Sequence, residues 1–85
     1  MLFRSRSMMK ILLSENVNIA SQLTSQNVIY VIQYDFDLLD EMVTIPSGCV
    51  LDFQGGSIIN GTIVFDDTYI LFNRESGSFQ NCQYR

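Results

Sequence analysis

The chain has 85 residues, 47% of them hydrophobic, and its five basic and nine acidic residues give a net charge of −4. A chain of this length forms one domain at most and buries only about 60–65% of the surface that its unfolded form exposes. No Lys or Arg occurs from residue 11 to residue 73. This excludes a phosphate-contacting surface over that span, so we expect no nucleic-acid partner and no binding to an anionic membrane.

Residues 1–8 have the character of a flexible leader. Arg4, Arg6 and Lys10 hold three of the five basic residues, and only the three apolar residues of 11–13 follow them. A secretory signal peptide needs about 7–15 apolar residues at that place, and a membrane span needs about 18–20. We therefore expect neither segment here, and this region does not define a compartment.

Residues 9–26 are expected to form an N-terminal cap segment. Apolar residues with helical spacing begin at Ile19, and Asn18 can serve as an N-cap in front of them. The sequence predicts one or two turns of helix over residues 19–25.

Residues 27–37 are predicted to form the longest strand, because β-branched and aromatic side chains fill them almost throughout. Near the end of this run, Ile32, Tyr34 and Phe36 alternate with polar residues, which places the three on one face. A turn and a short strand over residues 43–45 follow.

Very short apolar runs come next, cut by turn residues every few positions. The predicted turn residues are Pro46, Gly48, Gly55, Gly56, Asn60 and Gly61. Segments of about 3–5 residues are too short for helices and are typical of a chain wound into a coil of parallel strands. Asn60, Gly61 and Thr62 also match the glycosylation pattern, but Asn-Gly fits a tight turn better.

A weak repeat supports the coil. Leu51 and Phe53 share one face of a predicted strand, and Ile70 and Phe72 share a face further along the chain. The offset is the same for both pairs, about 19 residues, which is close to one coil of a β-solenoid. Phe79 would begin the next layer.

The run from residue 27 to residue 72 resembles the N-terminal entry of right-handed parallel β-helix proteins. The motifs that carry the resemblance are Ile-Pro-Ser-Gly at 45–48, Leu-x-Phe-x-Gly-Gly at 51–56 and Asn-Gly-Thr-Ile at 60–63. These proteins form the pectate-lyase-like superfamily, which includes polysaccharide lyases, glycoside hydrolases and phage tail-spike proteins. The resemblance implies an all-β fold: an N-terminal cap, then the first one to two coils of a right-handed parallel β-helix over residues 27–85, truncated at the C-terminus.

The resemblance also implies a function. We expect a non-catalytic structural or capping segment of a surface or tail-spike-like protein that interacts with polysaccharide. The parent would be extracellular, on the cell surface or in a virion, and the chain would join the rest of a β-helix or self-associate. The alternatives are an N-terminal fragment of a polysaccharide lyase or glycoside hydrolase, and a free-standing oligomerising solenoid module. The family's catalytic motifs have no counterpart in this sequence, and no cofactor is implied.

Aromatic side chains are the candidates for a carbohydrate-binding surface. Tyr30, Tyr34 and Tyr69 could stack on pyranose rings, because aromatic faces suit sugars. The alternative is that they cover a strand surface that is partly exposed to solvent.

Carboxylates are weaker candidates. Asp35 and Asp37 are expected about 6–7 Å apart on one strand face, which could serve glycoside hydrolysis or calcium binding, but binary patterning alone also produces solvent-facing acids. Asp66 and Asp67 are candidate calcium ligands at a turn, where acids also bond to the backbone. Ser, Thr or Cys nucleophiles are excluded, because the chain has no His to activate them.

The two cysteines, Cys49 and Cys82, have no metal-binding spacing. Each lies in an apolar run, so we expect small buried hydrophobic side chains. A disulfide between them is the alternative.

Overall fold

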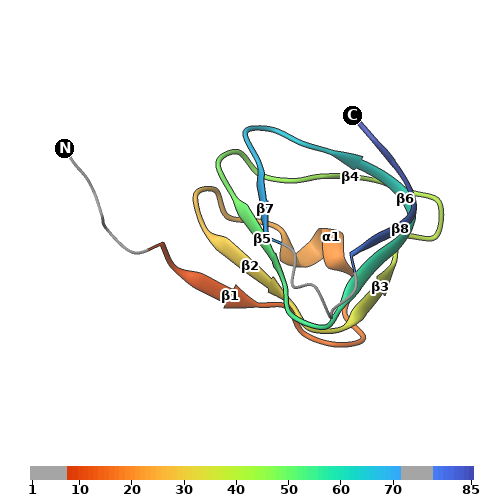
Figure 1. The fold of residues 1–85 in the computed structure, drawn as a ribbon, viewed down its shortest axis with the longest axis horizontal. Coiled ribbons are helices and arrows are strands. Elements are labelled where there is room, and N and C mark those ends of the chain that lie inside the picture. Colours follow the sequence, from red (N-terminus) through yellow and green to blue (C-terminus); the bar gives the residue numbers. More distant parts are fainter. Residues whose placement is uncertain (1–7, 72–77) are drawn as a thin grey trace.

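The computed structural model describes residues 8–71 and 78–85. The expected leader, apart from Met8, and Phe72 of the predicted repeat therefore lie outside the described residues. Over the described part, the protein is an all-β parallel solenoid, as the sequence predicted, and it has about three turns. In Figure 1 the strands of successive turns lie over one another around a ring.

Two sheets form the walls of this coil. Sheet A has the strand order β1 (Lys10–Leu12), β2 (Ile29–Ile32), β5 (Val50–Phe53), β7 (Tyr69–Leu71). Sheet B consists of β3 (Asp35–Asp37), β4 (Met42–Thr44), β6 (Ser57–Val64) and β8 (Phe79–Tyr84). All strand pairs are parallel. Parallel neighbours need a long crossover connection, and here the remainder of each turn supplies it.

The register of sheet A gives the length of each turn. Leu51 of β5 pairs with Tyr30 of β2 on one side and with Ile70 of β7 on the other. The pairing of Leu51 with Ile70 confirms the layer offset that the sequence predicted. The preceding turn is two residues longer, so the layers are stacked without a strict sequence repeat.

β6 runs along two sides of the coil. Its first three residues pair with β3 and its last three pair with β4, and Asn60 between them has a φ of 62°. The tight turn predicted at Asn60 and Gly61 is therefore a bend inside one eight-residue strand. A single left-handed residue redirects the chain there, while the hydrogen bonds to the neighbouring layers continue on both sides.

The predicted long strand over residues 27–37 is wrong in its extent. The chain turns a corner at Gln33 and Tyr34, so its two halves are β2 of sheet A and β3 of sheet B. Ile32 and Phe36 are buried, whereas Tyr34 is 39% exposed and does not share their environment. The longest strand is β6 instead, among the residues that the structure describes.

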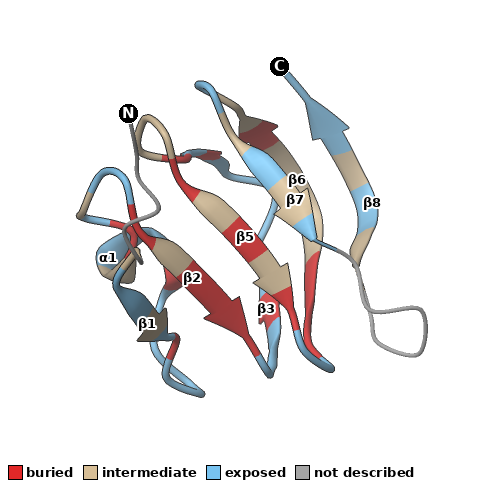
Figure 2. Ribbon diagram, turned by 60° about the vertical axis from the view of Figure 1, so that its left-hand side comes forward, coloured by how far each residue is buried: buried red, intermediate tan, exposed pale blue. Residues whose placement is uncertain are grey.

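The short helix α1 (Ile19–Gln22) begins where the sequence predicted, and it ends three residues before the predicted Ser25. The Asn18 side-chain oxygen accepts hydrogen bonds from the backbone N–H groups of Ala20 and Ser21 at 2.8 and 3.3 Å. These bonds satisfy donors that the first turn of a helix leaves free. In Figure 1, α1 lies inside the outline of the ring, and Figure 2 shows it at the same end of the coil as β1.

The inward side chains of all layers form one core. Its buried members are Leu13, Ile19, Leu23, Val28, Tyr30, Ile32, Phe36, Leu38, Val43, Ile45, Cys49, Leu51, Phe53, Ile58 and Ile63. Both cysteines are free: Cys49 is buried as expected, and Cys82 is half-buried against the same core.

We expect Leu51→Ala to lower the free energy of unfolding by about 2–5 kcal/mol, because truncation of a fully buried side chain leaves a cavity. Leu51 is 0% exposed in the middle of sheet A. The matched control is Leu12→Ala in β1, where the leucine is 59% exposed and we expect a change within about 0.5 kcal/mol. Equilibrium unfolding in urea measures both variants. Equal losses would contradict the layer assignment.

Candidate functional site

Tyr30, the first predicted sugar-stacking residue, is completely buried. Its hydroxyl donates to the carbonyl oxygen of Ser25 at 3.0 Å and accepts from the N–H group of Ser25 at 2.8 Å. The thiol of Cys49 donates to the same carbonyl at 3.2 Å. Tyr30 therefore has no face free for a sugar, and it ties the segment after α1 to the interior of the coil.

The other two predicted tyrosines are exposed but do not form one surface. Tyr69 is at the start of β7, in register with Val50 of β5 and, one layer earlier, with Ile29. Tyr34 follows the end of β2 by two residues. The two side chains thus belong to opposite ends of the strands of sheet A, and the structure does not bring them together.

The predicted metal ligands Asp66 and Asp67 are both exposed at the corner between β6 and β7. The backbone N–H group of Asp66 donates to the hydroxyl of Thr68 at 3.1 Å, and its carbonyl accepts from Gly48 at 3.1 Å. In the ranges 8–71 and 78–85, no group of three or more His, Cys, Asp or Glu side chains could hold a metal ion. The corner is thus ordered by two hydrogen bonds of the Asp66 backbone, one from the Gly48 N–H group and one to the Thr68 hydroxyl.

Asp35 and Asp37 are also exposed, and Asp37 belongs to a ladder of side chains on sheet B. Its carboxylate accepts from the N–H group of Leu39 at 2.8 Å and from the Asn60 amide at 3.3 Å. Asn60 in turn accepts from the amide of Asn81 at 2.7 Å. One member of the ladder comes from each of three successive layers, so these bonds fix the corner of the coil from layer to layer.

Three of the predicted turn glycines, Gly48, Gly56 and Gly61, have no room for a side chain; a Cβ atom on Gly61 would lie 2.7 Å from the carbonyl oxygen of Glu41. A Cβ atom on Gly56 would lie 2.3 Å from the carbonyl oxygen of Tyr34, one layer earlier. Gly48 has a φ of 73°, and a Cβ atom there would lie 2.2 Å from the side-chain oxygen of Asn27. Corners of successive layers are therefore stacked so closely that a side chain does not fit. Pro46 and Gly55 lie outside the strands, on either side of β5.

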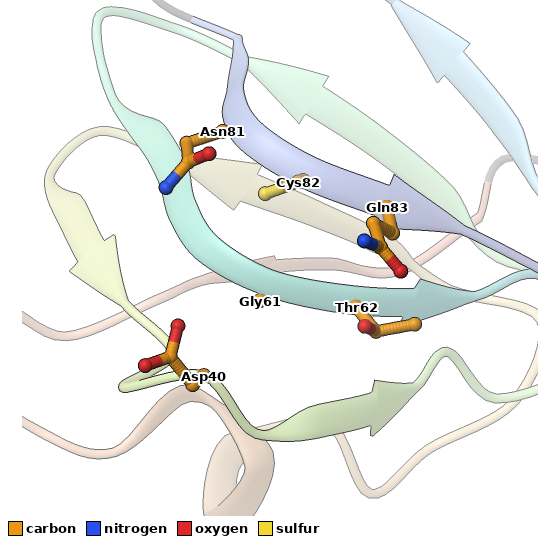
Figure 3. A pocket seen from close by; sticks show the side chains of 6 residues that line it. All are labelled: Asp40, Gly61, Thr62, Asn81, Cys82 and Gln83. Carbon is orange, nitrogen blue, oxygen red and sulfur yellow. The ribbon is translucent and has the colours of Figure 1, made fainter.

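A shallow groove of about 310 Å³ lies beside the ladder of Asp37, Asn60 and Asn81 (Figure 3). Its lining residues are Asp40, Gly61, Thr62, Asn81, Cys82 and Gln83. The groove exists because residues 38–41, between β3 and β4, lie opposite only residues 60–61 of the next layer. The extra residues form a projecting turn in which Leu39 and Asp40 have φ values of 54° and 64°.

This groove offers carboxylate, amide and hydroxyl groups but no aromatic face among its described lining residues. Such groups can form hydrogen bonds with a hydroxyl-rich ligand. Its residues come from three layers, so no local motif marks them in the sequence. Tyr69 is on sheet A and the groove is on sheet B, so the predicted aromatic residue does not extend the groove.

The two ends of the coil differ in how well they are covered, as the burial colours in Figure 2 show. At the first end, Leu13, Ile19 and Leu23 are all buried beside α1. At the other end, Tyr84 of β8 is 55% exposed, whereas Ile63, which it overlies, is 0% exposed. On the sheet B side, the coil is therefore closed by α1 at the first end and open at β8, whereas on sheet A the edge strands β1 and β7 show the same partial exposure among the described residues.

The comparisons with known proteins found no relative: no family model, no curated protein and no solved structure matches the chain. The part of the resemblance that stands is the parallel β-solenoid of about three turns. In the described part of the chain, no helix is long and apolar enough to cross a membrane.

We expect Asn60→Ala to lower the free energy of unfolding by about 2 kcal/mol, for two reasons. Alanine at this positive φ is strained and, unlike asparagine, has no polar side chain that can bond locally to the backbone. The substitution also removes the hydrogen bonds of the ladder. Asn60→Gly accepts the same φ and removes only the ladder bonds, so its loss should be about half as large. Urea denaturation of both variants separates the two contributions. Equal losses of unfolding free energy in Asn60→Ala and Asn60→Gly would mean that alanine is not strained at this positive φ.

Proposed function

We propose that this chain is a non-catalytic structural segment: the capped start of a β-solenoid in a surface or tail-spike-like protein that interacts with polysaccharide. The single observation that carries this proposal is the difference between the two ends of the coil on the sheet B side, where α1 covers the first end and β8 lies at the other. An end that is covered by its own helix stops the stack of layers. An end whose inward side chains stay half-exposed leaves room for another layer.

The closed end has the features of a terminator. α1 replaces the sheet B strands in the first layer, so β3 and β4 meet a helix instead of a further strand. The buried side chain of Ile19 fills the interior at this end. Unpaired strand edges invite edge-to-edge aggregation unless a helix or loop covers them, and terminal repeats of solenoids serve this purpose.

Three comparisons between layers define the open end. Leu51 is 0% exposed, while Ile70, which overlies it, is half-buried. Ile58 is 1% exposed, while Phe79 above it is half-buried. The third pair is Ile63 and Tyr84. Each of these three inward positions thus has less cover in the last layer, and a further layer stacked there would cover it.

The polysaccharide partner rests on two supports. The resemblance to the pectate-lyase-like superfamily is the first, and the polar groove of Figure 3 is the second. The non-catalytic character rests on the sequence, in which no position matches the catalytic motifs of that superfamily, and Asp37 is engaged in the ladder. A fragment of a polysaccharide lyase or glycoside hydrolase remains the alternative.

We expect Ile19→Asp to destabilise the fold by at least about 2 kcal/mol, because it buries a charge and opens the covered end. The neighbouring change Ala20→Asp introduces the same charge at an exposed position of the same helix and should be nearly neutral. Thermal unfolding and binding of a hydrophobic dye report stability and exposed core. If the two variants behave alike, α1 does not close the coil.

The purified chain should bind, but not cleave, neutral surface polysaccharides. Reducing-end release and unsaturated-product absorbance detect hydrolase and lyase activity, and retardation in polysaccharide-containing gels detects binding. Asn81→Ala and Gln83→Ala should weaken retardation, while Tyr69→Ala should leave it unchanged. Release of any product that Asp35→Asn and Asp37→Asn together abolish would establish the enzymatic alternative.

A further inference from the structure

We propose that the surface around Leu39 binds a short cationic segment of a partner protein, one that carries a large apolar side chain. This Leu39 surface consists of the projecting turn over residues 38–41 and the two hollows between this turn and the segment that contains α1. It is distinct from the polar groove of Figure 3, and the proposal goes beyond the proposed function without resting on it.

The backbone conformation of Leu39 is the observation that carries this proposal. Among the described residues other than glycine, seven have a positive φ, and Leu39 is one of them, with a φ of 54°. The other six are all asparagine or aspartate: Asn16, Asn27, Asp40, Asn60, Asp67 and Asn81. Short polar side chains tolerate this conformation, whereas a leucine is strained in it. A strained residue that its surroundings hold in place points to a functional position.

The Leu39 side chain gains no burial in return for this strain. It is 73% exposed, the highest value among the exposed large apolar side chains of the described residues. The turn is held in place, because the N–H group of Leu39 donates to the Asp37 carboxylate and that of Asp40 donates to the Asn60 carbonyl, both at 2.8 Å. An asparagine here would relieve the strain and remove an exposed apolar group. A contact with a partner gives a physical reason for a leucine at this position.

Two hollows adjoin Leu39, and Ile19 and Asp37 line both of them. The hollow of about 170 Å³ extends to Met42, and the hollow of about 270 Å³ extends to Val17. Met42 and Val17 are both exposed. A dry cavity of about 150 Å³ can hold a benzene ring, so each hollow has room for one large apolar side chain of a partner.

Carboxylates border these apolar groups. Asp35 and Asp37 line the larger hollow, and Asp37 and Glu41 line the smaller one. In residues 8–71 and 78–85 the only basic side chains are Lys10 and Arg85, and neither forms an ion pair with these acids. A partner of complementary charge is therefore cationic.

The same carboxylates disfavour two other occupants. A second copy bound through the same surface would bring like charges together, and anionic lipid headgroups would be repelled in the same way. A cationic segment with an apolar side chain matches both the charge and the hollows. We expect weak binding, with a Kd of roughly 10–100 μM at low salt, because the two hollows offer a small contact area.

Fluorescence anisotropy of labelled heptapeptides mixed with the full chain tests the proposal. The probe Lys-Leu-Lys-Phe-Lys-Leu-Lys should bind about tenfold more tightly than two control peptides. Lys-Ser-Lys-Ser-Lys-Ser-Lys has the same charge, and Glu-Leu-Glu-Phe-Glu-Leu-Glu has the same apolar side chains. Equal binding of the two cationic peptides would mean that net charge alone attracts them, and no binding of the probe would mean that the surface does not accept such a segment. Either result would overturn the proposal.

Leu39→Asn distinguishes a binding role from a structural role. It keeps the charge of the surface and should raise the midpoint of thermal unfolding by about 3–6 °C, because asparagine tolerates the positive φ. The same change should weaken binding of the probe by about tenfold. The matched control is Leu71→Asn at an exposed leucine of sheet A, which should not raise the midpoint and should leave binding unchanged. Unchanged binding in Leu39→Asn, or an equal loss in Leu71→Asn, contradicts the proposal.

The double variant Asp35→Asn, Glu41→Gln tests the charge of the surface. It should weaken binding of the probe by about three- to tenfold at low salt and by less at high salt, where charges are screened. Gln83→Ala, in the polar groove, should leave it unchanged, so the polysaccharide experiment can fail independently of this one. Self-association, or adsorption to phosphatidylcholine vesicles, that Leu39→Asn abolishes would assign the surface to a second copy or to a lipid and would overturn the proposal.

Discussion

Contact between successive layers is the interaction on which the rest of this structure depends. A single turn of about twenty residues has no interior of its own, so its inward side chains are buried only by the turns above and below it. Leu51, with Tyr30 on one side and Ile70 on the other, is completely buried, whereas Ile70 itself is not. The inward side chains at the two ends of the coil are therefore the least buried, unless another element covers them.

The closed end depends on polar anchors as much as on apolar cover. Tyr30 and Cys49 come from two successive layers, yet both bond to the backbone of Ser25. A tyrosine inside a narrow coil needs a partner for its hydroxyl, and the chain leaving α1 supplies one. This arrangement aligns α1 with the layers beneath it and explains why an aromatic residue in a strand need not mark a binding surface.

The sequence predicted the features that depend on near neighbours or on one layer spacing. Asn18 marked the start of α1 because capping needs only the next three residues, and the offset from Leu51 to Ile70 marked a full turn. The corner at Tyr34 was missed, because alternation of apolar and polar residues continues on both sides of it. The groove was missed because its lining residues, which include Asp40 and Asn81, meet only after three layers are stacked.

The projecting turn at Leu39 and Asp40 shows how this coil accommodates extra residues. Four residues there lie opposite two in the next layer, yet β3 and β4 keep their register with β6. The surplus is directed outward, while Asp37, Asn60 and Asn81 hold the corner in place. Changes of loop length at this corner can therefore reshape the outer surface without moving the core, which makes the corner the place where one scaffold could acquire different binding surfaces.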